Sequence, residues 1–195
     1  MLKNSLKKVF SLLVFLQGLL IVTGGAVRLT GSGLGCPTWP TCTGNSYKPV
    51  PHQAQGQLHA WIEFGNRLIA WLIFIIALLA LVGTVKYLKA RTDYRKLRTL
   101  ASYQLLGFLG QVILGGITVL TKLNPISVSG HFLLSIPLLS GAISLRQRYL
   151  YQDFYSVSAT SMLLKNIYLN LVIALIVIGT ITTGSGPLAG DLAAK

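Results

Sequence analysis

Five long apolar runs dominate this sequence and restrict its possible folds more than any other feature. Each run is close to the roughly 20 residues that a helix needs to cross a hydrocarbon core of about 30 Å. The runs cover residues 9–27, 60–85, 100–120, 128–145 and 167–183. Only 11% of the residues are charged and the mean hydropathy is +0.64, which leaves too little charge for a soluble surface. The sequence therefore predicts an all-α fold, a polytopic transmembrane helix bundle with five spans.

The first apolar run follows Lys3, Lys7 and Lys8, a pattern that secretory signal peptides also have. The run ends in Thr-Gly-Gly-Ala-Val and Arg28, and no cleavage site marks a change to a soluble composition. We therefore expect this run to be retained as the first span.

Positive charge lies mainly on one side of the predicted membrane. The chain has 17 Lys and Arg residues against 4 Asp and Glu, a formal net charge of +13. Most basic residues precede the first run or lie at 86–98 and 146–165, between runs, which does not indicate a nucleic-acid-binding surface. The positive-inside rule predicts a cytoplasmic N-terminus, with the C-terminus and the loop at 28–59 outside. We expect a multi-pass protein of a bacterial inner membrane.

A short motif occurs twice, at equivalent places in the chain. Thr-Gly-Ser-Gly follows the first run at 30–33 and the fifth run at 183–186. The two copies indicate a tandem repeat of four-helix units, although so short a match also arises by chance. We expect residues 1–150 to form an N-terminal four-helix transmembrane bundle with an outer loop at 28–59. Residues 151–195 would then form a linker and the first helix of an incomplete second bundle.

One face of the second span carries four polar side chains. At about 100° per residue, Glu63 lies about 40° from His59, and Asn66 lies about 20° to the other side. Arg67 lies about 80° away. Ionisable groups inside a membrane are costly and usually pair or line a functional cavity. An ion pair between Glu63 and Arg67 that serves only packing is the alternative, but the shared stripe favours a functional site.

His131 lies near the outer end of the fourth span, at a depth comparable with the polar stripe. A lone histidine in a helix is more often structural than a ligand. Two histidines on antiparallel helices at one depth, here His59 and His131, suit axial ligation of a heme iron. Both interpretations of His131 stay open at this stage.

The third span is rich in glycine. Glycines permit a flat macrocycle or a neighbouring helix to approach the backbone, and plain helix packing explains them at least as well. The residues concerned are Gly107, Gly110, Gly115 and Gly116, together with Gln104 and Gln111.

The two cysteines, Cys36 and Cys42, lie close together in the outer loop. They could form a structural disulfide, whose entropic stabilisation would be modest for so short a loop. A redox role toward a substrate or partner is a second possibility. A metal site is a weak third, because no pair of histidines lies nearby.

Three motifs of the chain resemble those of the heme A synthase family. Residues 24–40 (Gly-Gly-Ala-Val-Arg-Leu-Thr-Gly-Ser-Gly-Leu-Gly-Cys-Pro-Thr-Trp-Pro) are similar to the family's first outer loop. Residues 62–67 (Ile-Glu-Phe-Gly-Asn-Arg) are similar to its second-helix motif, and residues 179–191 to its fifth-helix motif. The resemblance covers the whole chain, and the first motif is specific.

The resemblance implies a fold of eight helices in two pseudo-symmetric four-helix bundles. It implies oxidation of a ring methyl group of the substrate heme O to a formyl group, giving heme A for cytochrome c oxidase assembly. By motif, Glu63 matches the catalytic carboxylate, His131 a heme ligand of the N-terminal bundle, and Cys36 and Cys42 the outer-loop pair. Asn66 and Arg67 are implied near the heme. Heme O synthase, oxidase assembly factors and a second copy of the chain are expected partners.

Two departures from the family pattern affect these expectations. The motif often reads Glu-x-x-His, and Asn66 occupies the histidine position here. We therefore expect His59 and His131 to flank the substrate heme iron. The family's last three helices, which carry the second histidine pair and most of the heme b cofactor site, are not in this chain. A non-catalytic heme-binding or assembly protein, or a truncated half-enzyme, is the alternative to an oxidoreductase, and a transporter is a weaker one.

Overall fold

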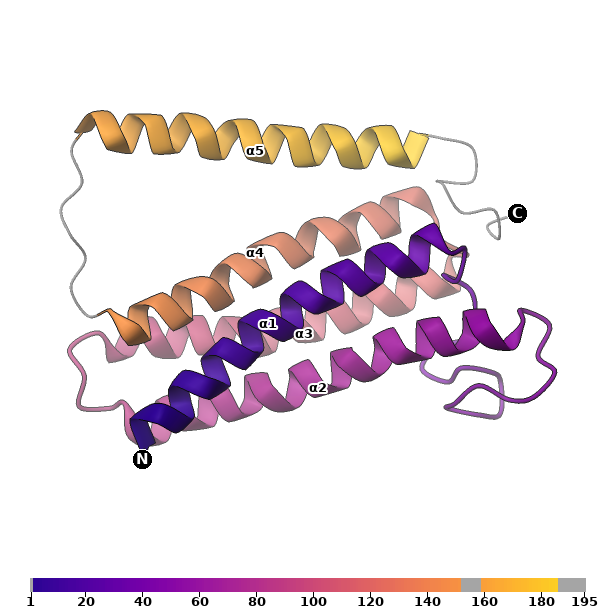
Figure 1. The fold of residues 1–195 in the computed structure, drawn as a ribbon, viewed down its shortest axis with the longest axis horizontal. Coiled ribbons are helices and arrows are strands. Elements are labelled where there is room, and N and C mark those ends of the chain that lie inside the picture. The colour runs from indigo at the N-terminus through magenta and orange to yellow at the C-terminus, as the bar shows by residue number, and fades with distance from the viewer. Residues whose placement is uncertain (1, 152–158, 186–195) are drawn as a thin grey trace.

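The computed structural model describes residues 2–151 and 159–185 of the chain. In this described part there are five α-helices and no β-strand, so the predicted all-α fold is confirmed. Each helix is long and apolar enough to cross a membrane. The helices are α1 Leu2–Leu29, α2 Gln57–Tyr87, α3 Tyr94–Leu120, α4 Pro125–Leu150 and α5 Ala159–Ser185 (Figure 1).

Each helix contains one of the five predicted spans and extends beyond it. The extensions at one end contain basic residues, such as Lys7 and Lys8 in α1 and Arg95 and Lys96 in α3. Lys and Arg are good helix formers, so the helix continues after the apolar run has ended. The apolar runs therefore predict the spans well and the helix ends poorly.

Helices α1 to α4 form a closed bundle with alternating chain direction. Each packs on its neighbours in the order α1, α2, α3, α4 and back to α1, while α5 packs on α4 (Figure 1). From Ser161 to Thr182, α5 has no buried residue. The division into units at 1–150 and 151–195 stays a prediction, and both the linker at 152–158 and the end of the second Thr-Gly-Ser-Gly copy lie outside the described residues.

We call the end of the bundle with the start of α1 and the α2–α3 connection the inner end. The inner half has a dense apolar core, in which Phe10, Leu13, Ile73, Leu97 and Leu145 are almost fully buried. Side chains of α1 thus form part of this core.

The connections at the inner end are fixed by one arginine. Arg91 pairs with Asp93 at 2.8 Å and donates to the backbone carbonyls of Arg148 and Tyr149, near the end of α4. Carbonyls in the last turn of a helix lack helical partners, so Arg91 both satisfies them and ties the α2–α3 connection to α4. The same guanidinium lowers the pKa of the Asp93 carboxyl, mainly through its hydrogen bond.

The outer half of the bundle is packed differently. No residue is buried at 18–29 of α1, 64–72 of α2, 109–115 of α3 or 125–137 of α4. All four helices of the closed bundle thus pass through a layer, which we call the open layer, where side chains remain partly accessible. Native interiors are normally close-packed, so this layer is packed less tightly than the inner half.

Candidate functional site

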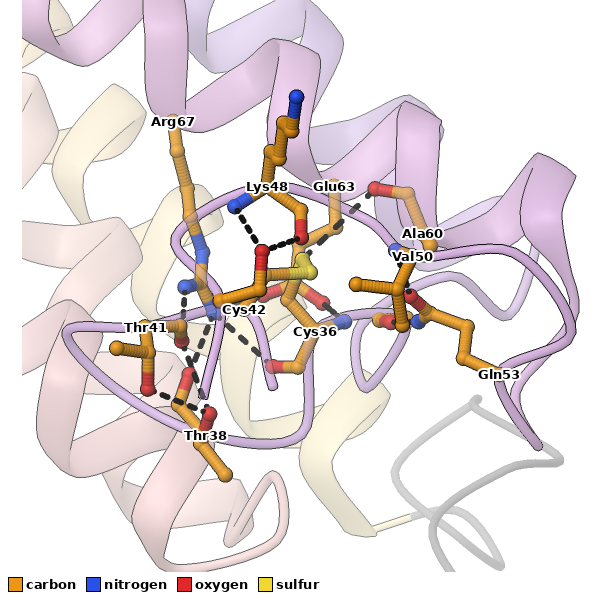
Figure 2. The surroundings of a disulfide bond; sticks show 12 residues. Cys36, Thr38, Thr41, Cys42, Lys48, Val50, Gln53, Ala60, Glu63 and Arg67 are labelled. Carbon is orange, nitrogen blue, oxygen red and sulfur yellow. Dashed lines mark hydrogen bonds and ion pairs between the residues drawn. A yellow bond between two sulfur atoms is a disulfide. The ribbon is translucent and has the colours of Figure 1, made fainter. Parts of the chain in front are cut away.

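The outer loop, residues 30–56, is anchored to α2 by Glu63 and Arg67. One carboxylate oxygen of Glu63 accepts a 2.7 Å hydrogen bond from the backbone N–H of Cys36, and the other pairs with Arg67 at 2.6 Å (Figure 2). The side chain of Glu63 is only 8% exposed and that of Arg67 20%. The ion pair that was the alternative to a functional site is therefore present, and it does more than pack α2, because Glu63 also binds the loop.

Arg67 completes this anchor from the other side. Its guanidinium donates to the backbone carbonyls of Cys36, Thr38 and Thr41 at 3.0–3.1 Å (Figure 2). Arginine's planar fork of donors suits several acceptors at once, which lysine's single ammonium group does not. The segment from Cys36 to Cys42 is thus held by hydrogen bonds to the Arg67 side chain.

The cysteines of this segment are joined. Cys36 and Cys42 form a disulfide with an S–S distance of 2.04 Å, and neither residue is exposed. The predicted disulfide is confirmed. Because Cys36 also donates to Glu63, the bridge, the ion pair and the start of the loop form one unit.

His59 is held by the Thr-Gly-Ser-Gly motif. The Ser32 hydroxyl lies 2.9 Å from His59 Nδ1 and 2.7 Å from the Thr30 hydroxyl, and Ser32 is fully buried. A side chain at Gly35 would overlap the backbone carbonyl of His59, so glycine is required where the loop crosses the first turn of α2. A hydrogen bond at Nδ1 orients an imidazole and leaves Nε2 for another partner.

Asn66 faces a different neighbour from Glu63 and Arg67. Its side-chain oxygen accepts a 2.7 Å hydrogen bond from the Thr23 hydroxyl of α1. The amide thus links α1 and α2 within the open layer.

His131 projects toward α3 at the outer end of the bundle. Its Nδ1 is buried and has no hydrogen-bond partner, and its ring lies 3.2 Å from the position a Cβ would take on Gly115. Gln111, one turn earlier on α3, also has a buried side-chain oxygen without a partner. Buried polar atoms are normally hydrogen-bonded, so these two atoms are candidates to contact a bound ligand.

The glycines of α3 serve packing, which was one of the two interpretations of them. Gly107 and Gly110 lie against Leu138 and Leu134 of α4. Gly116 lies against the Trp39 indole of the outer loop. The outer loop therefore reaches from Arg67 on α2 to Gly116 on α3. Gly116 is next to Gly115, the glycine that His131 contacts.

Below the open layer, a buried amide pair closes the bundle. Gln17 of α1 donates to Gln104 of α3 at 2.6 Å, and Gln104 donates to the carbonyl of Leu138 on α4. The Gln17 side-chain oxygen has no partner. These contacts mark the lower boundary of the open layer with polar groups from three helices.

Several of these residues were missed at the sequence level. Gln17, Thr23 and Trp39 gave no periodic signal. Ser32 lies within the repeated Thr-Gly-Ser-Gly motif. Serine hydroxyls in turns often form local hydrogen bonds, so the motif could have suggested that Ser32 has a hydrogen-bonding role.

Replacing Gly116 with Ala should loosen the outer loop. The new Cβ would lie 2.8 Å from Trp39 Cδ2, so the indole has to move, at a cost of about 1–3 kcal/mol for overpacking. Gly179→Ala in α5 is the matched control, because no atom lies within 4 Å of its Cβ position. Both substitutions gain similar helix propensity, so the difference in thermal unfolding midpoint isolates the overlap. Equal midpoints would show that Trp39 does not rest on α3.

Comparison with known proteins gives a consistent result. Residues 7–190 match the family model described as cytochrome oxidase assembly protein (COX15-CtaA). The chain is 34% identical over 122 residues to a heme A synthase of Geobacillus thermodenitrificans, covering 60% of this chain and 34% of the relative. It is 36% identical over 126 residues to a heme A synthase of Lysinibacillus sphaericus, covering 64% and 38%. The matches thus span little more than a third of these relatives' length.

Proposed function

Because the chain belongs to the cytochrome oxidase assembly protein family, we propose that it takes part in heme A biosynthesis as a heme A synthase-like oxidoreductase. Its substrate would be heme O, whose ring methyl group is oxidised to a formyl group for cytochrome c oxidase assembly. The observation that carries this proposal is the open layer, where His131 and Gln111 present buried polar atoms without partners.

The open layer is the proposed place for the flat, largely apolar heme. It is bordered below by the Gln17–Gln104 pair and above by the outer loop. His131 would ligate the iron from α4, and His59, oriented by Ser32, would do so from α2. Asn66 is engaged by Thr23 and would contact the ligand without binding iron. Heme b is the proposed cofactor of the oxidoreductase.

Glu63 is proposed as the carboxylate of the reaction. Both of its oxygens accept charge-assisted or backbone hydrogen bonds, an arrangement that suits an ionised carboxylate. Of the two roles expected from the sequence, proton acceptance and stabilisation of developing positive charge near the methyl carbon, these contacts favour the second. Arg67 would position Glu63 and the disulfide loop relative to each other.

The proposed orientation places the inner end in the cytoplasm and the disulfide loop outside. The basic segments at the inner end support it. The disulfide agrees with an oxidising outer compartment. Heme O synthase, assembly factors and a second copy of this chain are the proposed partners.

The test is to purify the chain in detergent from cells that make heme O and to identify the extracted heme by mass. Heme A in the wild type, and heme O alone in Glu63→Gln, would support an oxidoreductase. Heme O or heme b alone in the wild type would support the alternative, a heme-binding assembly protein or half-enzyme. Absence of heme from the wild type would contradict both.

A further inference from the structure

A second site lies at the inner end, far along the bundle from the open layer. A pocket of about 360 Å³ lies between the first turns of α3 and the last turn of α4. Its lining consists of Arg95, Lys96, Thr99, Leu100 and Arg148. Three of the five lining residues are cationic, and they come from two helices.

Arg148 lies close enough to Asp93 to help lower the pKa of that carboxyl, so the case for an anion site depends on Arg95 and Lys96. Among the described residues, two carboxylates form ion pairs, Glu63 with Arg67 and Asp93 with Arg91. Neither Arg95 nor Lys96 therefore faces a carboxylate of the described chain. The start of α3 adds the partial positive charge of a helix N-terminus at the same place. An anion is the ligand that this pocket favours.

The surface next to the pocket carries an aromatic and an aliphatic side chain, Tyr103 and Leu106, beside the hydroxyl of Thr99. Thr99, Tyr103 and Leu106 lie on one face of α3, at spacings of four and three residues, and Leu106 is 67% exposed. This face descends from the pocket along a membrane-spanning helix. A free anion would use the cations alone, whereas a phospholipid would also cover this face.

We propose that this pocket binds the phosphate headgroup of an anionic phospholipid, with an acyl chain along the α3 face of Thr99, Tyr103 and Leu106. Basic pockets between transmembrane helices at the cytoplasmic side have the chemistry to select such headgroups. Arg91 and Asp93 hold α3 to α4 beside the pocket, so its two walls are fixed relative to each other. The inference is independent of the heme chemistry proposed for the outer half.

The experiment titrates phosphatidylglycerol onto the full chain in neutral detergent and counts bound lipid by native mass spectrometry. Arg95→Gln with Lys96→Gln should weaken binding roughly 30-fold, the factor expected from two charges at a phosphate site. Lys8→Gln with Lys89→Gln removes two exposed charges from the same end without touching the pocket, and should retain wild-type affinity. Equal losses in the two double variants would overturn the proposal.

One further variant and two competing ligands test the proposal independently of the charge variants. Leu100→Trp fills the pocket without changing charge, so it should also displace the lipid even if the charge variant folds poorly. Phosphatidylcholine and inorganic phosphate are the competing probes. If inorganic phosphate displaces phosphatidylglycerol at equal concentration, the site holds free anions and the lipid assignment is wrong; if phosphatidylcholine binds equally well, headgroup charge is not recognised.

Discussion

Replacing Glu63 with Ala is expected to lower the free energy of unfolding by about 3 kcal/mol. The substitution leaves Arg67 without its anion and the Cys36 N–H without its acceptor. Removing one partner of a buried ion pair costs about 3–5 kcal/mol, and the 20% exposure of Arg67 favours the lower end. Chemical unfolding in detergent measures the change.

A double-mutant cycle with Arg67→Ala distinguishes a coupled anchor from two separate contacts. We expect the double variant to be less destabilised than the sum of the single variants by about 1–3 kcal/mol. Glu63→Gln is the control, because it removes the charge but keeps an acceptor for Cys36. Faster reduction of the Cys36–Cys42 disulfide should accompany both alanine variants. Strict additivity would mean that the ion pair and the loop are independent.

The second large effect is on heme binding. His131→Ala is expected to weaken heme O binding by about 100-fold or more, since even outer-shell partners of metal ligands contribute 10–100-fold. His131 is the ligand candidate whose Nδ1 has no protein partner, and its ring packs against Gly115, where a Cβ would lie only 3.2 Å from it. Spectroscopic titration of the purified chain with heme O measures the affinity and reports the iron's ligand set.

His59→Ala and Ser32→Ala test the second ligand. If His59 ligates iron, its replacement changes the heme spectrum, and Ser32→Ala weakens binding about 10-fold by freeing Nδ1. His52→Asn is the histidine control, because His52 is exposed in the outer loop and its φ of 59° suits asparagine. Unchanged spectra in both His59→Ala and Ser32→Ala would show that another group lies opposite His131.

The sequence was informative where one helix carries the whole signal. Each apolar run gave one span, because about 20 apolar residues in water are too costly to expose. The spacing of Glu63 and Arg67, on neighbouring turns of one helix, was enough to name their ion pair as an alternative, and the structure contains it. The spacing of Cys36 and Cys42 likewise made a local disulfide possible.

The sequence was less informative about which neighbour each polar group meets. The stripe grouped Asn66 with Glu63 and Arg67, yet Asn66 contacts Thr23 of α1 while the other two hold the outer loop. The α3 glycines fitted a macrocycle or a helix equally, and they contact α4 and Trp39. A helical wheel gives the direction of a side chain around the axis of its own helix. It does not say which neighbouring helix or loop lies in that direction.

The sequence by itself therefore determined the spans, their number in this chain, and the polar positions on each helix, since these follow from local periodicity and the cost of exposing or burying single groups. The tertiary structure decided that Glu63 and Arg67 hold the disulfide loop, that Ser32 orients His59, and that an open layer lies beside His131. These contacts join residues far apart in the chain. They depend on how four helices pack around one another, which no single segment specifies.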